Sequence, residues 1–305
     1  MKPKQQIAGI PPAIEQRVRA HGPVLDMPFT RAIYEPLLAA QPRAGTRIIQ
    51  DQSYGPDKRH RLDVYSPDPA AALPAPVAIV FPGGGFVRGD KSERENAGLV
   101  FARAGVVTVI PNYRLGPTHR WPAGAEDVVR AVSWVRSHAA EYGGDPERIW
   151  LVGESAGATH VASATLLRRF HPSGGLPIAG SVLISGVYNL ELERRARRQF
   201  GIATPDPRNE AYFGTDFEHY PSMSLVDQID AEPIPILITY AELDLVQMQV
   251  QAGELFARLV TQHGFSPELQ VIRGHNHLTQ VYSLNTGDES LSAPVLKFML
   301  GQRES

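Results

Sequence analysis

Short apolar runs rich in β-branched residues recur along this chain of 305 residues, with longer amphipathic stretches between them. Each run is nearly continuous, as expected of a strand that is buried on both faces of a sheet. The stretches between the runs place apolar residues at the three- and four-residue spacing of a helix. This alternation predicts an α/β fold with a mostly parallel central sheet and helices on both faces. The predicted strands are 77–81, 106–110, 149–152, 181–184, 236–240 and 269–272, and the predicted helices are 93–104, 126–140, 155–169 and 246–263.

The other segments are expected to decorate that sheet within a single domain, residues 1–305. Segments 47–52 and 61–65 alternate polar and apolar residues, which is typical of an antiparallel hairpin at a sheet edge. Residues 1–45 look helical but are broken by prolines, and residues 189–235 replace a single crossover helix with a long mixed insertion. Long excursions beyond the carboxyl ends of strands commonly carry function, so both segments are predicted to form a helical lid.

Two further expectations concern these lid segments. The N-terminal segment carries apolar residues that need a partner surface, and bulky residues of the insertion offer one. The N-terminal set is Val24, Leu25, Met27, Phe29, Ile33, Tyr34, Leu37 and Leu38, and the insertion set is Tyr212, Phe213, Tyr220 and Met223. The locally basic run of residues 191–198 is interpreted as a solvated helix face rather than a binding patch.

Composition argues against several partners and chemistries. The formal net charge is −2, which gives no electrostatic reason to expect nucleic acid or an anionic membrane surface as partner. The absence of cysteine excludes disulfides and thiolate catalysis. The first twelve residues lack an apolar leader segment, and no stretch approaches the length needed to span a bilayer. A soluble cytoplasmic protein that binds neither nucleic acid nor membrane is therefore expected.

The pentapeptide Gly-Glu-Ser-Ala-Gly at residues 153–157 joins the apolar run 149–152 to a predicted helix. A G-x-S-x-G sequence between a strand and a helix is typical of a nucleophile elbow, which is a turn too sharp for bulky residues beside the serine. Gly153 and Gly157 leave room in such a turn, and Ser155 stands exposed with its hydroxyl at the helix N-terminus. Ser155 is thus a candidate nucleophile for attack on a carbonyl carbon.

A serine nucleophile needs a general base and a group that orients the base. The loop after the fifth predicted strand holds Glu242 and Asp244, and the loop after the sixth holds His275 and His277. The order serine, acid, histidine is the one expected of α/β-hydrolases, and each group follows the carboxyl end of a strand. Asp244 is favoured over Glu242 because it lies further beyond the strand, where the loop can turn back towards histidine. These considerations leave His275 and His277 as competing bases.

Attack on a carbonyl also needs hydrogen-bond donors for the oxyanion. Ala156 supplies the backbone N–H that follows the nucleophile, and the glycine loop 83–85 follows the first predicted strand. Consecutive glycines let backbone N–H groups point into a site without a Cβ in the way. A plain tight turn is the alternative, and a phosphate loop is disfavoured because no Gly-Lys-Ser/Thr follows.

Several short motifs occur together in this chain. They are the glycine loop at 82–90, Pro-Asn-Tyr-Arg-Leu at 111–115, Trp-Pro-Ala at 121–123, Gly-Asp-Pro-Glu-Arg-Ile at 144–149, the elbow, Asn-His at 276–277 and Thr-Gly-Asp-Glu at 286–289. With them the chain resembles the hormone-sensitive-lipase-like carboxylesterases and related esterase and formamidase families, from about residue 61 to 299. The resemblance implies that His277 is the base and that Gly84, Gly85 and Ala156 donate to the oxyanion.

The chain departs from that family at two positions. Pro82 stands where the family usually has histidine, and Asn112 stands where it usually has aspartate. The histidine helps to hold the glycine loop, so its loss removes one support. Neither position is catalytic by role, and we expect altered loop rigidity or acyl-site shape with activity retained.

The expected function is hydrolysis of small carboxylic esters with short or medium acyl chains, through Ser155, His277 and Asp244 and an acyl-enzyme. No metal or organic cofactor is required, and a metal site at His275 and His277 is disfavoured because no third ligand lies nearby. Amide or formamide hydrolysis on the same triad is the alternative. A non-catalytic receptor is disfavoured because all three catalytic residue types are present. The edge strand of such a sheet could pair across a two-fold axis, which allows a homodimer.

Overall fold

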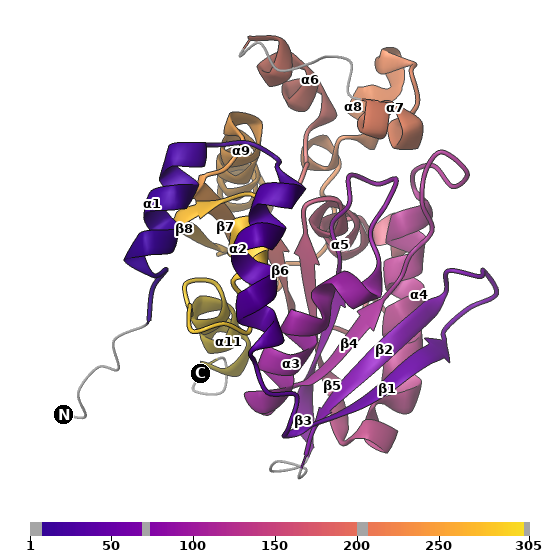
Figure 1. The fold of residues 1–305 in the computed structure, drawn as a ribbon. Helices are drawn as coiled ribbons and strands as arrows, with labels where there is room; N and C mark the ends of the chain where they lie inside the picture. Colours follow the sequence, from indigo (N-terminus) through magenta and orange to yellow (C-terminus); the bar gives the residue numbers. More distant parts are fainter. Residues whose placement is uncertain (1–7, 69–73, 200–206, 302–305) are drawn as a thin grey trace.

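The computed structural model describes residues 8–68, 74–199 and 207–301. These residues form an eight-stranded sheet. The strand order is β1-β2-β4-β3-β5-β6-β7-β8. Strand β2 pairs antiparallel with β1 and β4, and the other neighbouring strands are parallel. The predicted mostly parallel sheet and its antiparallel edge hairpin are thus confirmed (Figure 1). The strands are β1 Thr46–Ser53, β2 Arg61–Pro67, β3 Ala75–Phe81, β4 Val107–Pro111, β5 Gly144–Glu154, β6 Gly180–Ile184, β7 Ile236–Leu243 and β8 Glu268–Asn276.

Helices cover both faces of this sheet (Figure 1). One face packs against α4 Ala123–His138, α5 Ala156–Leu166 and α9 Val246–His263. The opposite face packs against α1 Pro12–His21, α2 Met27–Ala39, α3 Glu95–Arg103, α10 Thr279–Tyr282 and α11 Ser292–Gly301. Three short helices, α6 Leu190–Gln199, α7 Pro207–Phe213 and α8 Tyr220–Met223, gather at the top of Figure 1. None of the described helices combines the length and apolar character needed to cross a bilayer.

Strand β3 shows how sequence pattern becomes a two-faced core. Val77, Ile79 and Phe81 point to the cluster under α4 and α5, whereas Ala78 and Val80 point to the cluster under α3 and α11. Successive side chains of a strand alternate between faces, so a strand covered by helices on both faces must be apolar throughout. All seven residues of β3 are buried. The continuous apolar runs in the sequence have this origin.

The N-terminal segment packs elsewhere than expected. Val18, Ile33 and Tyr34 belong to the core on the α3 and α11 face, and α1 contacts the edge strand β8. Tyr212, Phe213, Tyr220 and Met223 of the insertion instead pack with Phe86, Ala156, Val187 and Met248. The predicted packing of one lid segment on the other is therefore wrong, because α1 packs against β8 and α2 packs against α10, where their apolar residues join the core of that face.

The basic run 191–198 also differs from its interpretation as a solvated face. It forms most of α6, in which Glu193 and Arg197 are 3% and 7% exposed while Arg195 and Arg198 face solvent. The amide of Gln251 on α9 donates to the Glu193 carboxylate at 3.0 Å. That hydrogen bond, with the Glu193–Arg197 ion pair of 3.6 Å, offsets the cost of burying both charges.

Candidate active site

Ser155 occupies a sharp turn between β5 and α5. Its backbone dihedral angles, φ of 50° and ψ of −119°, are strained for any residue other than glycine. Its N–H donates to the Ile184 carbonyl at 2.8 Å. A Cβ on Gly153 would lie 2.5 Å from the Gly157 carbonyl oxygen, and one on Gly157 would lie 2.2 Å from the Phe81 carbonyl oxygen. Both contacts are too short for any side chain. The turn thus requires glycine on both sides of the serine.

A hydrogen-bonded chain connects Ser155 to a buried carboxylate. The Nε2 atom of His277 lies 3.1 Å from Ser155 Oγ, and its Nδ1 atom lies 2.7 Å from Asp244 Oδ1. Ser155 follows β5, Asp244 follows β7 and His277 follows β8, all at the same edge of the sheet. The structure therefore brings the three predicted residues together with a serine–imidazole–carboxylate geometry.

Sequence reasoning missed two residues that hold the carboxylate in place. Asp244 Oδ2 accepts from the hydroxyl of Ser185, and the Asp244 carboxylate also accepts from the N–H of Leu245 at 2.9 Å. Gln280 donates to Ser185 Oγ at 2.8 Å and to the His277 carbonyl at 3.2 Å. Ser185 directly follows β6. A polar residue directly after a buried strand is the sequence signal that could have identified Ser185 as a site residue. No comparable signal marks Gln280.

The environment of His277 favours its protonated form. Burial disfavours the imidazolium, but the charge of Asp244 and the hydrogen bond to it outweigh burial and raise the pKa of His277 above its ordinary value of 6.5. The charge of Glu154 adds to this effect, whereas the guanidinium of Arg208 opposes it. An imidazole of this kind can accept a proton from a serine hydroxyl.

The two competing residues lie outside this chain of hydrogen bonds. Glu242 forms an ion pair with Arg19 of α1 at 2.9 Å and accepts from the Gly274 N–H at 2.8 Å. These hydrogen bonds lower the pKa of Glu242. His275 is fully buried and pairs with Asp288 at 3.0 Å. Glu242 thus ties α1 to the ends of β7 and β8, and His275 supports the loop from inside.

The glycine loop lies against the nucleophile. Gly85 and Ala156 line the same cavity as Ser155 and His277. Gly84, with φ of 139°, is in the same turn but is not among the residues that line the cavity. The roles of Gly84, Gly85 and Ala156 as donors to the oxyanion all stay predictions.

Residues of both predicted lid segments line the cavity beside Ser155. Its described lining includes Leu25 from the α1–α2 turn, Arg197 from α6, Arg208 from α7 and Met248 from α9. Tyr212 of α7 stacks on Phe86 of the glycine loop, with ring centroids 5.0 Å apart. The remaining space is about 30 Å³, which holds about one water molecule. An ester larger than this space can bind only if lining side chains move or if part of the ester stays in solvent.

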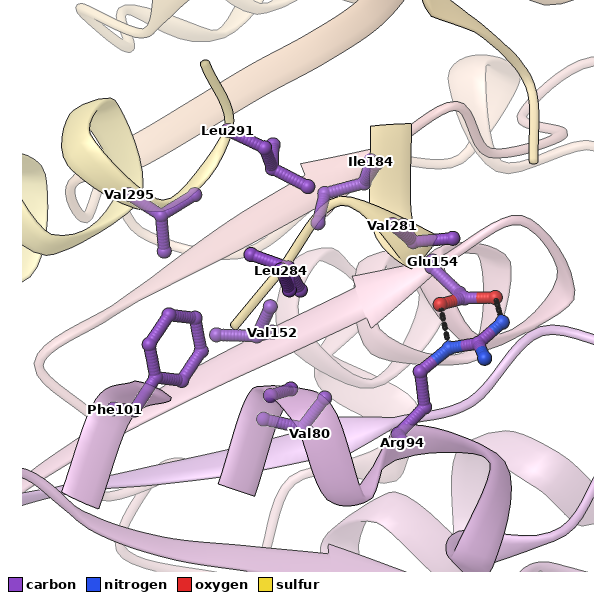
Figure 2. Close-up of a pocket in the computed structure, with 11 residues that line it drawn as sticks. Val80, Arg94, Phe101, Val152, Glu154, Ile184, Val281, Leu284, Leu291 and Val295 are labelled. Atoms are coloured by element: carbon purple, nitrogen blue, oxygen red, sulfur yellow. Dashed lines mark hydrogen bonds and ion pairs between the residues drawn. The ribbon is translucent and has the colours of Figure 1, made fainter. Parts of the chain in front are cut away.

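A buried ion pair lies next to the nucleophile on the α3 side of the sheet. Glu154 directly precedes Ser155, and both of its carboxylate oxygens accept from the Arg94 guanidinium (Figure 2). Arg94 is 3% exposed and Glu154 is 8% exposed. Apolar side chains, among them Val152 and Ile184, surround the small cavity beside the pair (Figure 2). The pair thus fixes the last residue of β5 against the helix layer.

Among the described residues, no group of three or more histidine, aspartate or glutamate side chains is placed to hold a metal ion. His275 and His277, the pair considered from the sequence, instead bind Asp288 and Asp244. Each imidazole thus has a carboxylate partner of its own.

Comparison with known proteins places the chain in a family. A family model described as alpha/beta hydrolase fold matches residues 78–281. The chain belongs to this family, which confirms the predicted fold and the family resemblance. The matched residues include the glycine loop, Ser155, Asp244 and His277.

Curated relatives match over part of their length. The chain is 27% identical over 248 residues to a probable isoprenylcysteine alpha-carbonyl methylesterase of Oryza sativa subsp. japonica, covering 76% of this chain and 58% of that protein. It is 31% identical over 220 residues to the probable carboxylic ester hydrolase LipM of Mycobacterium tuberculosis, covering 67% of this chain and 50% of that protein. The chain thus spans about half the length of these curated relatives.

Solved structures match over nearly the whole chain. A bacterial heroin esterase superposes with a TM-score of 0.73 at 24% identity, covering 96% of this chain and 98% of the other. A hyperthermophilic esterase from the archaeon Pyrobaculum calidifontis superposes with a TM-score of 0.71 at 22% identity, covering 96% and 99%. At these identities the likeness shows a shared fold.

Proposed function

We propose that this protein hydrolyses carboxylic esters with Ser155 as nucleophile, His277 as general base and Asp244 as the orienting carboxylate. One observation carries the proposal: His277 lies 3.1 Å from Ser155 Oγ and 2.7 Å from Asp244 Oδ1, and Ser155 occupies a strained turn beside a glycine loop. The names of the relatives, a methylesterase and a carboxylic ester hydrolase, support the same reaction class.

The proposed reaction has two halves. Ser155 Oγ bonds to the ester carbonyl carbon while its proton passes to His277 Nε2, and Asp244 stabilises the imidazolium through Nδ1–H. The oxyanion accepts from the backbone N–H groups of Gly84, Gly85 and Ala156. The intermediate collapses, and the alcohol leaves with the proton from His277. Water then attacks the acyl-enzyme by the same path and releases the acid.

The small size of the cavity favours short or medium acyl chains. Its apolar wall is built from Phe86, Val187, Leu245 and Met248, and the space beside Ser155 is small unless the lid segments move. A long acyl chain would have to displace more of this wall than a short one. We therefore expect the ratio kcat/KM to fall for p-nitrophenyl esters longer than octanoate.

Covalent labelling tests the proposal. A small phosphonate should attach to Ser155 and abolish turnover of p-nitrophenyl butyrate, and Ser155→Ala should lower kcat by about three orders of magnitude or more. Ser137→Ala, which changes an exposed serine of α4, should do neither. An adduct on another serine, with Ser155→Ala still active, would refute the assignment. Faster cleavage of N-formyl amides than of every ester in the panel would replace ester hydrolysis with formamide hydrolysis.

A further inference from the structure

A glutamine without a partner lies beside the reacting atoms. Gln247, in the first turn of α9, lines the cavity that also contains Ser155 and His277. Its side chain is fully buried, and neither Oε1 nor Nε2 has a hydrogen-bond partner among the described residues. Because a cavity of about 30 Å³ touches all three residues, Gln247 is within short reach of the ester bond that Ser155 would attack.

The next turn of the same helix shows how a buried glutamine is normally satisfied. Gln251 is as deeply buried as Gln247. Its Oε1 accepts from the N–H groups of Tyr188 and Asn189 at 2.5 and 2.7 Å, and its Nε2 donates to Glu193 at 3.0 Å. Buried side-chain amides are nearly always bonded in this way, because an unpaired donor or acceptor loses its hydration without compensation. No described residue offsets that loss at Gln247, whereas a methionine of similar size would avoid it.

We propose that the preferred substrate is an ester that carries a neutral carboxamide, and that the side-chain amide of Gln247 binds this carboxamide. The proposal rests on the ester hydrolase function proposed above and names its substrate class. The glutamine amide presents an acceptor and a donor side by side, and a carboxamide presents the complementary pair, so that two parallel hydrogen bonds can form. A ketone or an ionised carboxylate only accepts, so either group would leave Oε1 of Gln247 unpaired. A site built to hydrogen-bond a substrate group discriminates strongly against an analogue that lacks it.

Matched ester pairs test the proposal on the full chain. On the acyl side, the p-nitrophenyl ester of adipic acid monoamide is compared with the ester that has a methyl ketone in place of the carboxamide. On the alcohol side, m-carbamoylphenyl butyrate is compared with m-acetylphenyl butyrate. Each ketone has a similar shape and keeps the acceptor but lacks the N–H donors. We expect kcat/KM to favour the carboxamide member of at least one pair roughly ten- to a hundredfold, and Gln247→Met to remove most of that ratio.

Thermal unfolding of the free protein gives a second measurement, which does not depend on activity. Gln247→Met removes two unpaired polar atoms and should keep or raise Tm. Gln251→Met instead leaves the hydrogen-bond partners of Gln251 unpaired and should lower Tm by about 2 °C or more. If Gln247→Met lowers Tm as much as Gln251→Met does, the Gln247 amide is already bonded in the free protein and the proposal is overturned.

The controls separate this proposal from the function it rests on. Gln262→Met changes an exposed glutamine of the same helix and should leave the ratio unchanged. If the esters are cleaved but neither carboxamide is preferred over its ketone, or if Gln247→Met keeps the preference, the carboxamide site is refuted while ester hydrolysis stands. If no ester is cleaved and Ser155 takes no phosphonate, the proposed function itself fails.

Discussion

The Arg94–Glu154 ion pair offers a quantitative test of how the nucleophile turn is held. Replacing Arg94 with methionine keeps a long side chain against Tyr282 and the apolar wall but leaves the Glu154 carboxylate without its guanidinium. The cavity beside Glu154 is only about 10 Å³, at the lower limit for a single water molecule. Solvent therefore has little room to replace the lost partner.

The expected magnitude follows from burial. Removing one member of a buried ion pair costs about 3–5 kcal/mol, because the remaining charge is uncompensated. An unfolding entropy of about 2.1 cal/mol/K per residue gives about 0.6 kcal/mol per degree for a chain of 305 residues. Arg94→Met should therefore lower Tm by about 5–8 °C. The double variant Arg94→Met/Glu154→Gln removes both charges and should recover most of that loss.

Thermal unfolding followed by circular dichroism measures this difference at neutral pH. Arg136→Met is the matched control, because its partner Glu147 is 3.3 Å away and their side chains are 50% and 71% exposed. An exposed pair contributes about 0–1 kcal/mol, so the control should move Tm by less than about 2 °C. If Arg94→Met folds and shifts Tm no more than the control, the pair does not anchor this turn.

Three further outcomes are expected. For a neutral ester, kcat/KM should rise with pH and reach half of its maximum at a pH above 6.5, because His277 must be neutral to accept a proton and its pKa is raised. Half-maximal kcat/KM at a pH below 6.5 would contradict this. His277→Ala should lower kcat by about three orders of magnitude, whereas His275→Ala should mainly lower Tm because its pair with Asp288 is buried. Leu25→Ala should shift the preferred acyl length, because Leu25 lines the cavity. Val24→Ala should not, because Val24 is exposed and is not among the residues that line the cavity. Equal effects of the two substitutions would count against a lid role for the α1–α2 turn.

The sheet could be predicted from sequence because each of its strands carries its own signal. A strand such as β3 must be apolar on both faces, and that requirement appears as a continuous run whatever the rest of the chain does. The same logic places Ser155, Asp244 and His277, since residues that follow the carboxyl ends of parallel strands meet at one edge. These positions depend on local pattern and chain order, both of which a single sequence contains.

The insertion could not be predicted in the same way. The charges of α6 resemble those of a solvated helix, and only the placement of α9 reveals that Gln251 meets Glu193. Likewise the apolar residues of α1 and α2 indicate burial but not the surface that buries them. In both cases the partner is far away in the chain, and no residue pattern specifies which of several apolar or polar surfaces will be adjacent.

The two departures from the family pattern show how the glycine loop is held without the usual histidine. The hydroxyl of Tyr113 donates to the Pro82 carbonyl at 2.7 Å, so the start of the loop is fixed through its backbone. Asn112 accepts from the Lys91 N–H at 2.7 Å and donates to Asp90 at 2.8 Å, which fixes the segment after the loop. A neutral amide can do both, whereas an ionised aspartate could only accept and would face the Asp90 carboxylate. Asparagine at 112 therefore suits aspartate at 90, and the glycine loop is supported at both ends by the two residues that follow β4.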